Sequence, residues 1–175
     1  SYAGMVSRES IRIMLTHAAL HDVPVVAADV RNAHLQAPTP EKHYIICGPE
    51  FGLEHVGKKA VITRVLYGGE CAGRDFWHHL RSCMKFLGFV SSRGDPDVWM
   101  RESVRKDGST KYYEYVLLYT DDCLVISDRA ESILRDEIGK YFTLKEASIG
   151  TPSKYLGGKL RMIELVKGQN CLLYT

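Results

Sequence analysis

The sequence lacks the features that would place it in a specialised class of protein. It has no apolar run approaching the length of about 20 residues that a membrane-spanning helix needs, so we expect no membrane partner. It has almost no net charge, because 23 basic residues face 21 acidic ones, and its overall charge gives no argument for nucleic-acid binding. Hydrophobic residues make up 45% of the chain and charged residues 25%, which is typical of a globular domain.

Cysteine is present, but not in a pattern typical of a disulfide framework or a zinc site. The five cysteines at positions 47, 71, 83, 123 and 171 are odd in number and form no C-x-x-C. This pattern predicts reduced thiols in an intracellular compartment. His17 and His21 stand four residues apart, but "HAALH" lacks the glutamate of the zinc motif H-E-x-x-H. We interpret the two histidines as one face of a surface helix.

The stretch "GGECAGRD" has the G-x-x-x-x-G spacing of a phosphate-binding loop, between Gly68 and Gly73. A Walker loop continues with Lys and then Ser or Thr, whereas Arg74 and Asp75 follow here. Because the carboxylate of Asp75 would repel phosphate, we reject this interpretation.

The apolar patterns predict helices and strands without strict β-α-β alternation. Ser7 is a predicted N-cap for a helix with Ile11, Met14, Leu15 and Ala18 on its buried side. We expect further helices at 70–88 and 129–142, and strands at 25–30, 43–47, 60–68, 96–104, 112–119, 123–126 and, as a strand or hairpin, 154–165. This order favours an α+β fold, an antiparallel sheet with helices on one face.

Two adjacent carboxylates, Asp121 and Asp122, interrupt the stretch "YVLLYTDDCLVIS". The short apolar runs on either side predict two strands joined by a tight turn. Two unit charges about 4 Å apart repel by roughly 4 kcal/mol at an effective dielectric near 20. Water, a cation or protonation must offset that repulsion, and for an isolated pair a solvated turn is the commonest explanation.

A third carboxylate changes this interpretation. Asp29 ends the predicted buried strand "VVAADV", where a charged group is unusual unless it is paired, capped or bound to a cation. If that strand lies beside the hairpin, Asp29 joins Asp121 and Asp122 at one end of the sheet. Such a cluster can hold two divalent cations roughly 3.5–4 Å apart and serve phosphoryl transfer, and magnesium suits its oxygen ligands.

Several motifs, in a fixed order over nearly the whole chain, carry a family resemblance. They include "AADVRNAHLQAPT", "ITRVLYGGECAGRDFWHHL", "GDPDVWM", "VLLYTDDCLVIS" and "YLGGKL". Together they resemble the reverse transcriptase of copia-type retrotransposons, within the right-handed polymerases. The Y-x-D-D motif of that family corresponds to Tyr119–Asp122, its D-x-x-x-A motif begins at Asp29, and its primer-side Y-L-G corresponds to Tyr155–Gly157.

The resemblance implies an RNA-directed DNA polymerase palm with part of the fingers, formed by a first palm segment at 1–36, partial fingers at 37–71 and a second palm segment at 72–175. It implies two Mg²⁺ ions, for which Mn²⁺ can substitute. It also implies a primed RNA or DNA template, deoxynucleoside triphosphates and the rest of a Pol polyprotein as partners, in a cytoplasmic virus-like particle. The implied metal ligands are Asp29, Val30 (by its carbonyl), Asp121 and Asp122; the implied nucleotide-pocket residues are Ala33, His34, Gly68, Arg74 and Tyr119; and the implied nucleic-acid contacts are Lys154, Tyr155, Leu156, Gly157 and Lys159.

The chain departs from the family pattern at several positions. His34 replaces an aromatic residue that excludes the ribose 2′-hydroxyl, Gly69 and Glu70 replace Leu and Lys, and Thr120 replaces an aliphatic residue or Met. No counterpart of the preceding fingers segment, of a full thumb or of an RNase H domain is found, which predicts an internal segment of a longer polyprotein. A decayed or co-opted palm without catalysis therefore remains an alternative. A metal-dependent phosphohydrolase is another, but it does not explain the Y-x-D-D and Y-L-G motifs.

Overall fold

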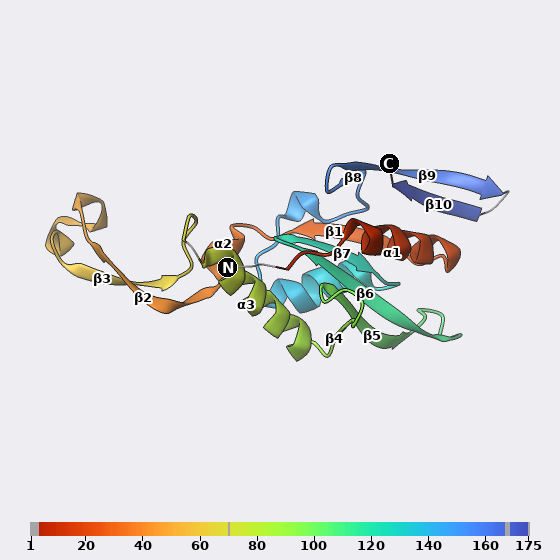
Figure 1. The fold of residues 1–175 in the computed structure, drawn as a ribbon, viewed down its shortest axis with the longest axis horizontal. Coiled ribbons are helices and arrows are strands. Elements are labelled where there is room, and N and C mark those ends of the chain that lie inside the picture. The colour runs from red at the N-terminus through yellow and green to blue at the C-terminus, as the bar shows by residue number, and fades with distance from the viewer. Residues whose placement is uncertain (1–3, 70, 167–168, 175) are drawn as a thin grey trace.

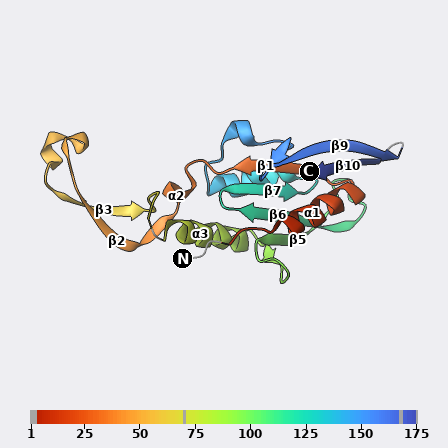
Figure 2. The ribbon, with the colours of Figure 1, turned by 45° about the horizontal axis from the view of Figure 1, so that its top comes forward.

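The computed structural model describes residues 4–69, 71–166 and 169–174. Its centre is a five-stranded antiparallel sheet with the strand order β1-β7-β6-β5-β4 (Figures 1 and 2). The hairpin that the sequence predicts around the adjacent aspartates is formed by β6 and β7, and β1 lies beside β7 as expected. The strands are β1 (Val25–Asp29), β4 (Val90–Ser91), β5 (Val98–Val104), β6 (Lys111–Tyr119) and β7 (Asp122–Ile126).

Helices cover both faces of this sheet, so the expectation of helices on one face is wrong. The helix α1 (Arg8–Leu20) packs on one face, and α3 (Ala72–Phe86) packs on the other. The reason lies in the apolar runs of β6 and β7, because neighbouring residues of a strand point to opposite faces. Leu117 packs in the core cluster of α1, whereas Val116 and Leu118 pack in the cluster of α3. A continuous apolar run therefore buries both faces of its strand.

The sequence patterns of the two long helices are confirmed. The Ser7 hydroxyl caps α1 by accepting a hydrogen bond from the Ser10 amide at 3.1 Å, and the predicted stripe of Ile11, Met14, Leu15 and Ala18 is buried. Gly88 follows α3 with a φ of +83°, the left-handed conformation typical after a helix. Within the described part of the chain, no helix is both long and apolar enough to cross a membrane.

The helix predicted at 129–142 is irregular. It consists of α4 (Ala130–Ser132), a π-helical turn η3 (Ile133–Glu137) and a 3-10 turn η4 (Ile138–Lys140). The apolar residues predicted to face inward, Ile133, Leu134 and Ile138, are fully buried. The amphipathic pattern therefore identified the buried face correctly but not the regularity of the backbone.

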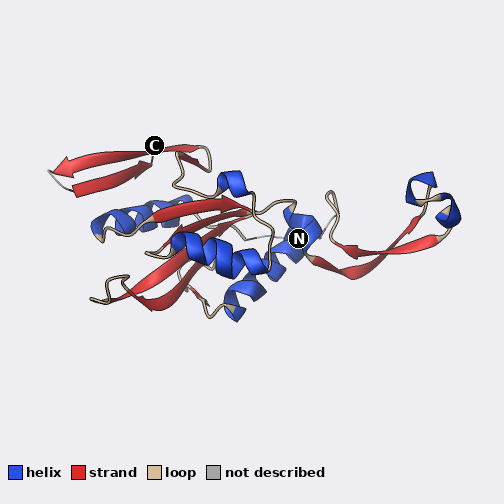
Figure 3. Ribbon diagram, turned by 180° about the vertical axis from the view of Figure 1, so that it is seen from behind, coloured by secondary structure: helices blue, strands red, loops and turns tan. Residues whose placement is uncertain are grey.

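A two-stranded ribbon projects from the body of the molecule (Figures 1 and 3). It is formed by β2 (Pro38–Ile46) and β3 (Lys59–Arg64), with two 3-10 turns, η1 (Pro49–Phe51) and η2 (Leu53–His55), between them. We call residues 38–64 the arm. The sequence predicted a small turn-rich lobe here, and it underestimated the length of the first strand. The short helix α2 (Ala33–Gln36) links β1 to the arm.

The C-terminal part forms a separate three-stranded sheet with the order β10-β9-β8. It consists of β8 (Lys154–Tyr155), β9 (Gly158–Val166) and β10 (Gln169–Tyr174), and Tyr155 and Leu160 pack in the core cluster of α1. Residues 143–150, which include the 3-10 turn η5 (Glu146–Ser148), run along the outer edge of β1, and we call them the edge strap. The amides of Ala27, Arg31 and Lys145 donate to the carbonyls of Gly150, Thr143 and Asp29, each at 2.9 Å.

Cys47, Cys71, Cys83 and Cys123 form no disulfide among the described residues. Burial raises the pKa of Cys83 to about 11 and that of Cys123 to about 12, so both are protonated at neutral pH. The side chain of Cys171 lies outside the described residues.

A buried network of ion pairs links the strands β5 and β6 to the π-helical turn η3. The Glu114 side chain on β6 is fully buried and accepts hydrogen bonds from Arg101 at 2.9 Å and Arg129 at 3.0 Å. Arg101 also donates to Glu137 in η3 at 2.8 Å. Burial alone would raise the pKa of Glu114, but the hydrogen bonds from Arg129, Arg101 and Ser127 outweigh it and lower that pKa.

The turn between β6 and β7 has two central residues, Thr120 and Asp121, because Tyr119 pairs with Asp122. Thr120 is exposed and has a φ of +51°. A β-branched residue is strained in this left-handed region, which tight hairpin turns require and which Gly, Asn and Asp adopt more readily. The strain is therefore stored next to the two adjacent carboxylates.

We expect Glu114→Gln to lower the free energy of unfolding by about 2–3 kcal/mol at pH 7, because two guanidinium groups lose their buried anionic partner. Since folding lowers the pKa of Glu114, its contribution exists above the unfolded pKa and is lost as the pH falls through the folded pKa. The difference between the two proteins should thus shrink in acid. Urea unfolding at several pH values measures it, with Glu102→Gln on the exposed side of β5 as the control. Equal stabilities at pH 7 would contradict the network.

We expect Thr120→Asn to stabilise the fold by about 1 kcal/mol, because asparagine tolerates the left-handed conformation better than a β-branched residue does. The side chain of Thr120 is exposed, so the change removes no core packing. Thermal unfolding measures the effect. Thr110→Asn, at an exposed position without positive φ, is the matched control and should leave the midpoint unchanged. A lower midpoint for the Thr120 variant would mean that the backbone is not strained there.

Candidate active site

The pairing of β1 with β7 brings carboxylates from distant parts of the chain together. Asp29 lies directly opposite Asp122, and Tyr119 lies opposite Asp122 on its other side. Opposed residues of antiparallel strands share one face, with their Cβ atoms about 4.5–5.5 Å apart. The Asp121 carbonyl accepts a hydrogen bond from the Val30 amide at 2.8 Å, which fixes the turn against the end of β1. The three aspartates therefore lie at one end of a single sheet, as predicted, but within the described residues their carboxylates do not form a group ready to hold a metal ion.

The environment of Asp122 is unfavourable to its negative charge. Its carboxyl pKa is raised to about 6, first by burial and then by the charges of Asp121 and Asp29, and the nearby Lys145 opposes this shift. Folding thus places Asp122 where a bound cation would relieve both the burial and the repulsion.

The carboxylate of Asp29 has two contrasting oxygens. Its Oδ1 atom is buried and has no hydrogen-bond partner, whereas Oδ2 accepts from Lys145 Nζ at 2.8 Å. This hydrogen bond and the charges of the three aspartates raise the pKa of Lys145. In the part of the chain that the structure describes, no three His, Cys, Asp or Glu side chains already surround a common point as metal ligands. An ammonium group thus lies on a carboxylate that the sequence predicts to be a metal ligand.

The sequence analysis did not identify Lys145. It lies 116 residues after Asp29, on the edge strap, and no spacing motif links the two. Ser148 was missed for the same reason: its hydroxyl accepts from the Asp29 amide at 2.9 Å and donates to the Lys145 carbonyl at 2.6 Å. The one hint in the sequence is that Lys145 directly follows the apolar Leu144, a position from which a lysine can lie close to a sheet.

A cavity of about 370 Å³ adjoins the carboxylates. Asp29 and Asp122 line it together with the chain from Ala147 to Leu156. Three of the residues that the resemblance assigns to nucleic-acid contact, Lys154, Tyr155 and Leu156, therefore lie beside the aspartates.

The turn between β8 and β9 is tight and strained. Leu156 and Gly157 both have positive φ, +46° and +83°, as in a type I′ hairpin turn. Lys154 and Lys159 lie directly opposite each other on either side of this turn, and both are exposed. Opposed like charges repel, so a bound anion such as phosphate would stabilise this pair.

The residues implied in a nucleotide pocket are only partly brought together. The His34 ring in α2 lies 4.6 Å from the Tyr67 ring and 6.0 Å from the Phe76 ring, and its Nδ1 atom is buried without a hydrogen-bond partner. Gly68 follows Tyr67 with a φ of +85°, and Ala33 is buried next to His34. Arg74, in contrast, pairs with its neighbour Asp75 at 3.1 Å.

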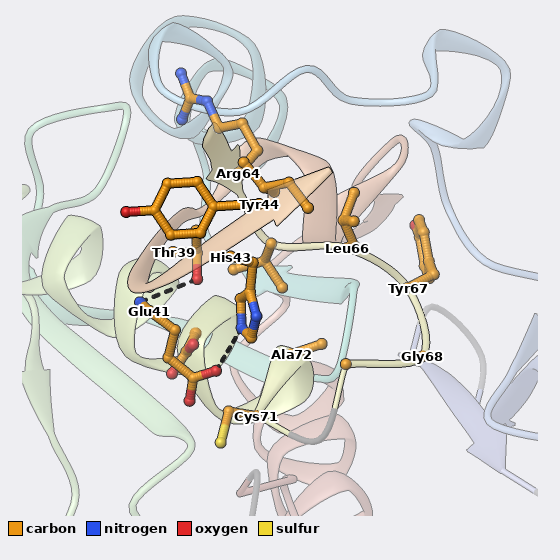
Figure 4. A pocket seen from close by; sticks show the side chains of 14 residues that line it. Thr39, Glu41, His43, Tyr44, Arg64, Leu66, Tyr67, Gly68, Cys71 and Ala72 are labelled. Carbon is orange, nitrogen blue, oxygen red and sulfur yellow. Dashed lines mark hydrogen bonds and ion pairs between the residues drawn. The ribbon is translucent and has the colours of Figure 1, made fainter. Parts of the chain in front are cut away.

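Gly68 lines a second cavity, of about 480 Å³, which lies between the arm and the start of α3 and is separate from the cavity beside Asp29 (Figure 4). There the Glu41 carboxylate lies 2.7 Å from a ring nitrogen of His43. None of the three aspartates lines this cavity, so it is not the carboxylate site, although it is larger than the cavity beside Asp29. Glu70, which the sequence analysis singled out, lies outside the described residues.

Comparison with known proteins agrees with this geometry. The family model described as reverse transcriptase (RNA-dependent DNA polymerase) matches residues 1–169. A retrovirus-related Pol polyprotein from transposon TNT 1-94 of Nicotiana tabacum is 30% identical over 164 residues, which cover 91% of this chain and 12% of the relative. The corresponding polyproteins from transposons RE1 and RE2 of Arabidopsis thaliana are each 26% identical over 149 residues, 83% of this chain and 10% of theirs.

The chain thus spans only about a tenth of the length of these relatives. The match to the family model, in contrast, extends over nearly the whole chain and includes β1, the β6–β7 turn and the β8–β9 turn. The chain therefore belongs to the reverse transcriptase (RNA-dependent DNA polymerase) family, as found in the Pol polyproteins of copia-type transposons.

Proposed function

We propose that this chain is the palm and part of the fingers of an RNA-directed DNA polymerase, which adds deoxynucleotides to a primer 3′-hydroxyl. The observation that carries the proposal is the register that sets Asp29 opposite Asp122, with Asp121 in the adjoining turn, in a chain of this family. In this proposal residues 1–36 and 72–175 form the palm, and residues 37–71, which contain the arm, form part of the fingers.

The residues at this end of the sheet suit divalent magnesium. The buried Oδ1 of Asp29 has no hydrogen-bond partner, and burial together with the charges of Asp121 and Asp29 raises the pKa of Asp122. Carboxylate and carbonyl oxygens are the ligands that magnesium and manganese prefer. Asp29, Asp121, Asp122 and the Val30 carbonyl would hold the two ions. When bound, the ions supply positive charge and Lewis acidity at the transferring phosphate.

The turn between β8 and β9 would position the primer end. Tyr155 is buried in the core cluster of α1, so the turn at Leu156 and Gly157 is fixed relative to the carboxylates. Lys154 and Lys159 are available for phosphate oxygens, which orient a nucleic acid without reading its sequence. This arrangement would hold the 3′-hydroxyl close to Asp29 and Asp122.

Ala33, His34, Gly68, Arg74 and Tyr119 would bind the incoming nucleotide. The His34 ring is held by its contacts with the Tyr67 and Phe76 rings. Arg74 would have to leave Asp75 to reach a triphosphate. A primed RNA or DNA template and the rest of a Pol polyprotein would complete the enzyme, in a cytoplasmic virus-like particle.

One observation favours a second candidate, a palm that binds nucleic acid but does not polymerise. The ammonium of Lys145 already neutralises part of the carboxylate charge. In such a protein this ion pair would replace the metal permanently, and the basic turn between β8 and β9 would still bind nucleic acid.

The test of the proposed function is primer extension on an RNA template by this chain joined to its flanking Pol sequence. We expect Mg²⁺-dependent incorporation that Asp122→Asn reduces by at least about 100-fold, because a metal ligand is lost. Asp107→Asn, in the exposed turn between β5 and β6, should retain the activity. Binding of the primed template without any incorporation would favour the non-catalytic palm instead.

We expect His34→Phe to increase discrimination against ribonucleotides. An imidazole is smaller than a phenyl ring, and it can donate or accept a hydrogen bond with a 2′-hydroxyl that a phenyl edge would only repel. Such an interaction is worth about 1–3 kcal/mol, which corresponds to a change of roughly 10- to 100-fold in the ratio of catalytic efficiencies.

Steady-state incorporation of one deoxynucleotide and one ribonucleotide measures this ratio. His78→Phe, on the exposed side of α3, is the control that adds the same ring elsewhere. Equal ratios with histidine and phenylalanine at position 34 would exclude His34 from sugar selection.

A further inference from the structure

The ion pair between Lys145 and Asp29 raises a question about the metal site. The Lys145 ammonium lies 2.8 Å from Asp29 Oδ2, and the three aspartates are the anionic groups that raise the pKa of Lys145. A divalent cation bound by Asp29 would have to share this carboxylate with the ammonium or displace it.

We propose that Lys145 is a tethered counter-ion, which neutralises Asp29 while no metal is bound and competes with the divalent cation for its carboxylate. Lys145 thereby sets the metal affinity of the site. This inference rests on the proposed function, since it needs Asp29 to be a metal ligand.

The backbone around Lys145 is held to β1. The Lys145 amide donates to the Asp29 carbonyl at 2.9 Å, and the Ser148 hydroxyl bridges the Asp29 amide and the Lys145 carbonyl. Two further contacts, between Val30 and Leu144 and between Ala27 and Gly150, extend this pairing along the edge strap. The Cα atom of Lys145 is therefore fixed next to the carboxylates, and the effective concentration of its ammonium is high.

The Lys145 side chain itself is not locked in place. It is 51% exposed, while the Asp29 side chain is 29% exposed. Lys145 also lines a neighbouring cavity of about 530 Å³ together with Arg31, Arg135 and Phe142. The ammonium can therefore leave Asp29 for solvent while the edge strap stays paired with β1. A tethered group that can move in this way acts as a competitor and not as a permanent replacement for the metal.

Charge explains why such a competitor is useful. Asp29 ends β1, Asp121 lies in the β6–β7 turn and Asp122 begins β7; the Lys145 ammonium contacts Asp29 and also favours the charged form of Asp122. Without a metal, the repulsion between the carboxylates would otherwise act on the turn that contains the strained Thr120. Lys145 reduces this repulsion in the metal-free protein. Because the ammonium already neutralises part of the carboxylate charge, a divalent cation gains less free energy when it binds.

The first test is a Mn²⁺ titration of the full chain, with free Mn²⁺ measured by electron paramagnetic resonance. For Lys145→Met and Lys145→Gln we expect a dissociation constant about two- to fivefold lower than in the unmodified chain, as for loss of one partly exposed ion pair. Lys140→Met, at an exposed position on η4, should bind like the unmodified chain, and Asp29→Asn should bind far more weakly. Equal affinities with and without Lys145 would overturn the inference but leave the proposed function intact. Failure of all the proteins to bind Mn²⁺ would overturn both.

A second test uses the unmodified chain and does not depend on how well the variants fold. Acetylation of lysines by acetic anhydride is followed by mass spectrometry with and without Mn²⁺. An ammonium held by a carboxylate reacts slowly, so Mn²⁺ should increase the acetylation of Lys145 several-fold and leave Lys140 unchanged. An unchanged rate at Lys145, at Mn²⁺ concentrations that the titration shows to be bound, would overturn the competition.

Discussion

The antiparallel pairing of β1 with β7 is the constraint on which the rest of this structure depends. It sets Asp29 opposite Asp122 and, by the same register, Ala28 opposite Cys123 in the core beneath α3. A slip of one residue would exchange the two faces of the strand, so the carboxylates would enter a buried core and apolar side chains would face the cavity. Because helices cover both faces of the sheet, the cores on both sides oppose such a slip. The position of the charges is thus determined by apolar packing.

Packing brings the three carboxylates together although they repel one another. The surrounding chain supplies positive charges that reduce this repulsion. The edge strap extends the sheet beyond β1 and supplies one ammonium to Asp29. The turn between β8 and β9 adds two further cations: Lys154, which lines the cavity beside Asp29 and Asp122, and Lys159, which lies opposite Lys154 across the turn. The phosphates of a nucleic acid would reduce the repulsion between Lys154 and Lys159. Cations bound between the aspartates would reduce the repulsion between the carboxylates. The proposed polymerase would need both kinds of ligand, a nucleic acid and divalent cations, at this end of the sheet.

Much of the local structure could be predicted from the sequence, because the relevant interactions are short in range. The Ser7 cap, the buried stripe of α1, Gly88 after α3 and the hairpin around Asp121 follow from the pattern of neighbouring residues. Two expectations failed where tertiary packing decided. The helices lie on both faces of the sheet, and the segment 130–140 contains a π-helical turn where its periodicity predicted a regular helix.

By itself, the sequence determined the elements, the two carboxylates of the turn, the aspartate that ends β1 and the family to which the ordered motifs belong. These are properties of adjacent residues or of motif order, and they do not depend on distances in space. Only the tertiary structure decided that Lys145 contacts Asp29, that Lys154 shares a cavity with Asp122 and that Glu114 is neutralised by Arg101 and Arg129. Each of these contacts depends on how strands, turns and strap pack together, and a periodic pattern contains no information about which charged side chains then meet.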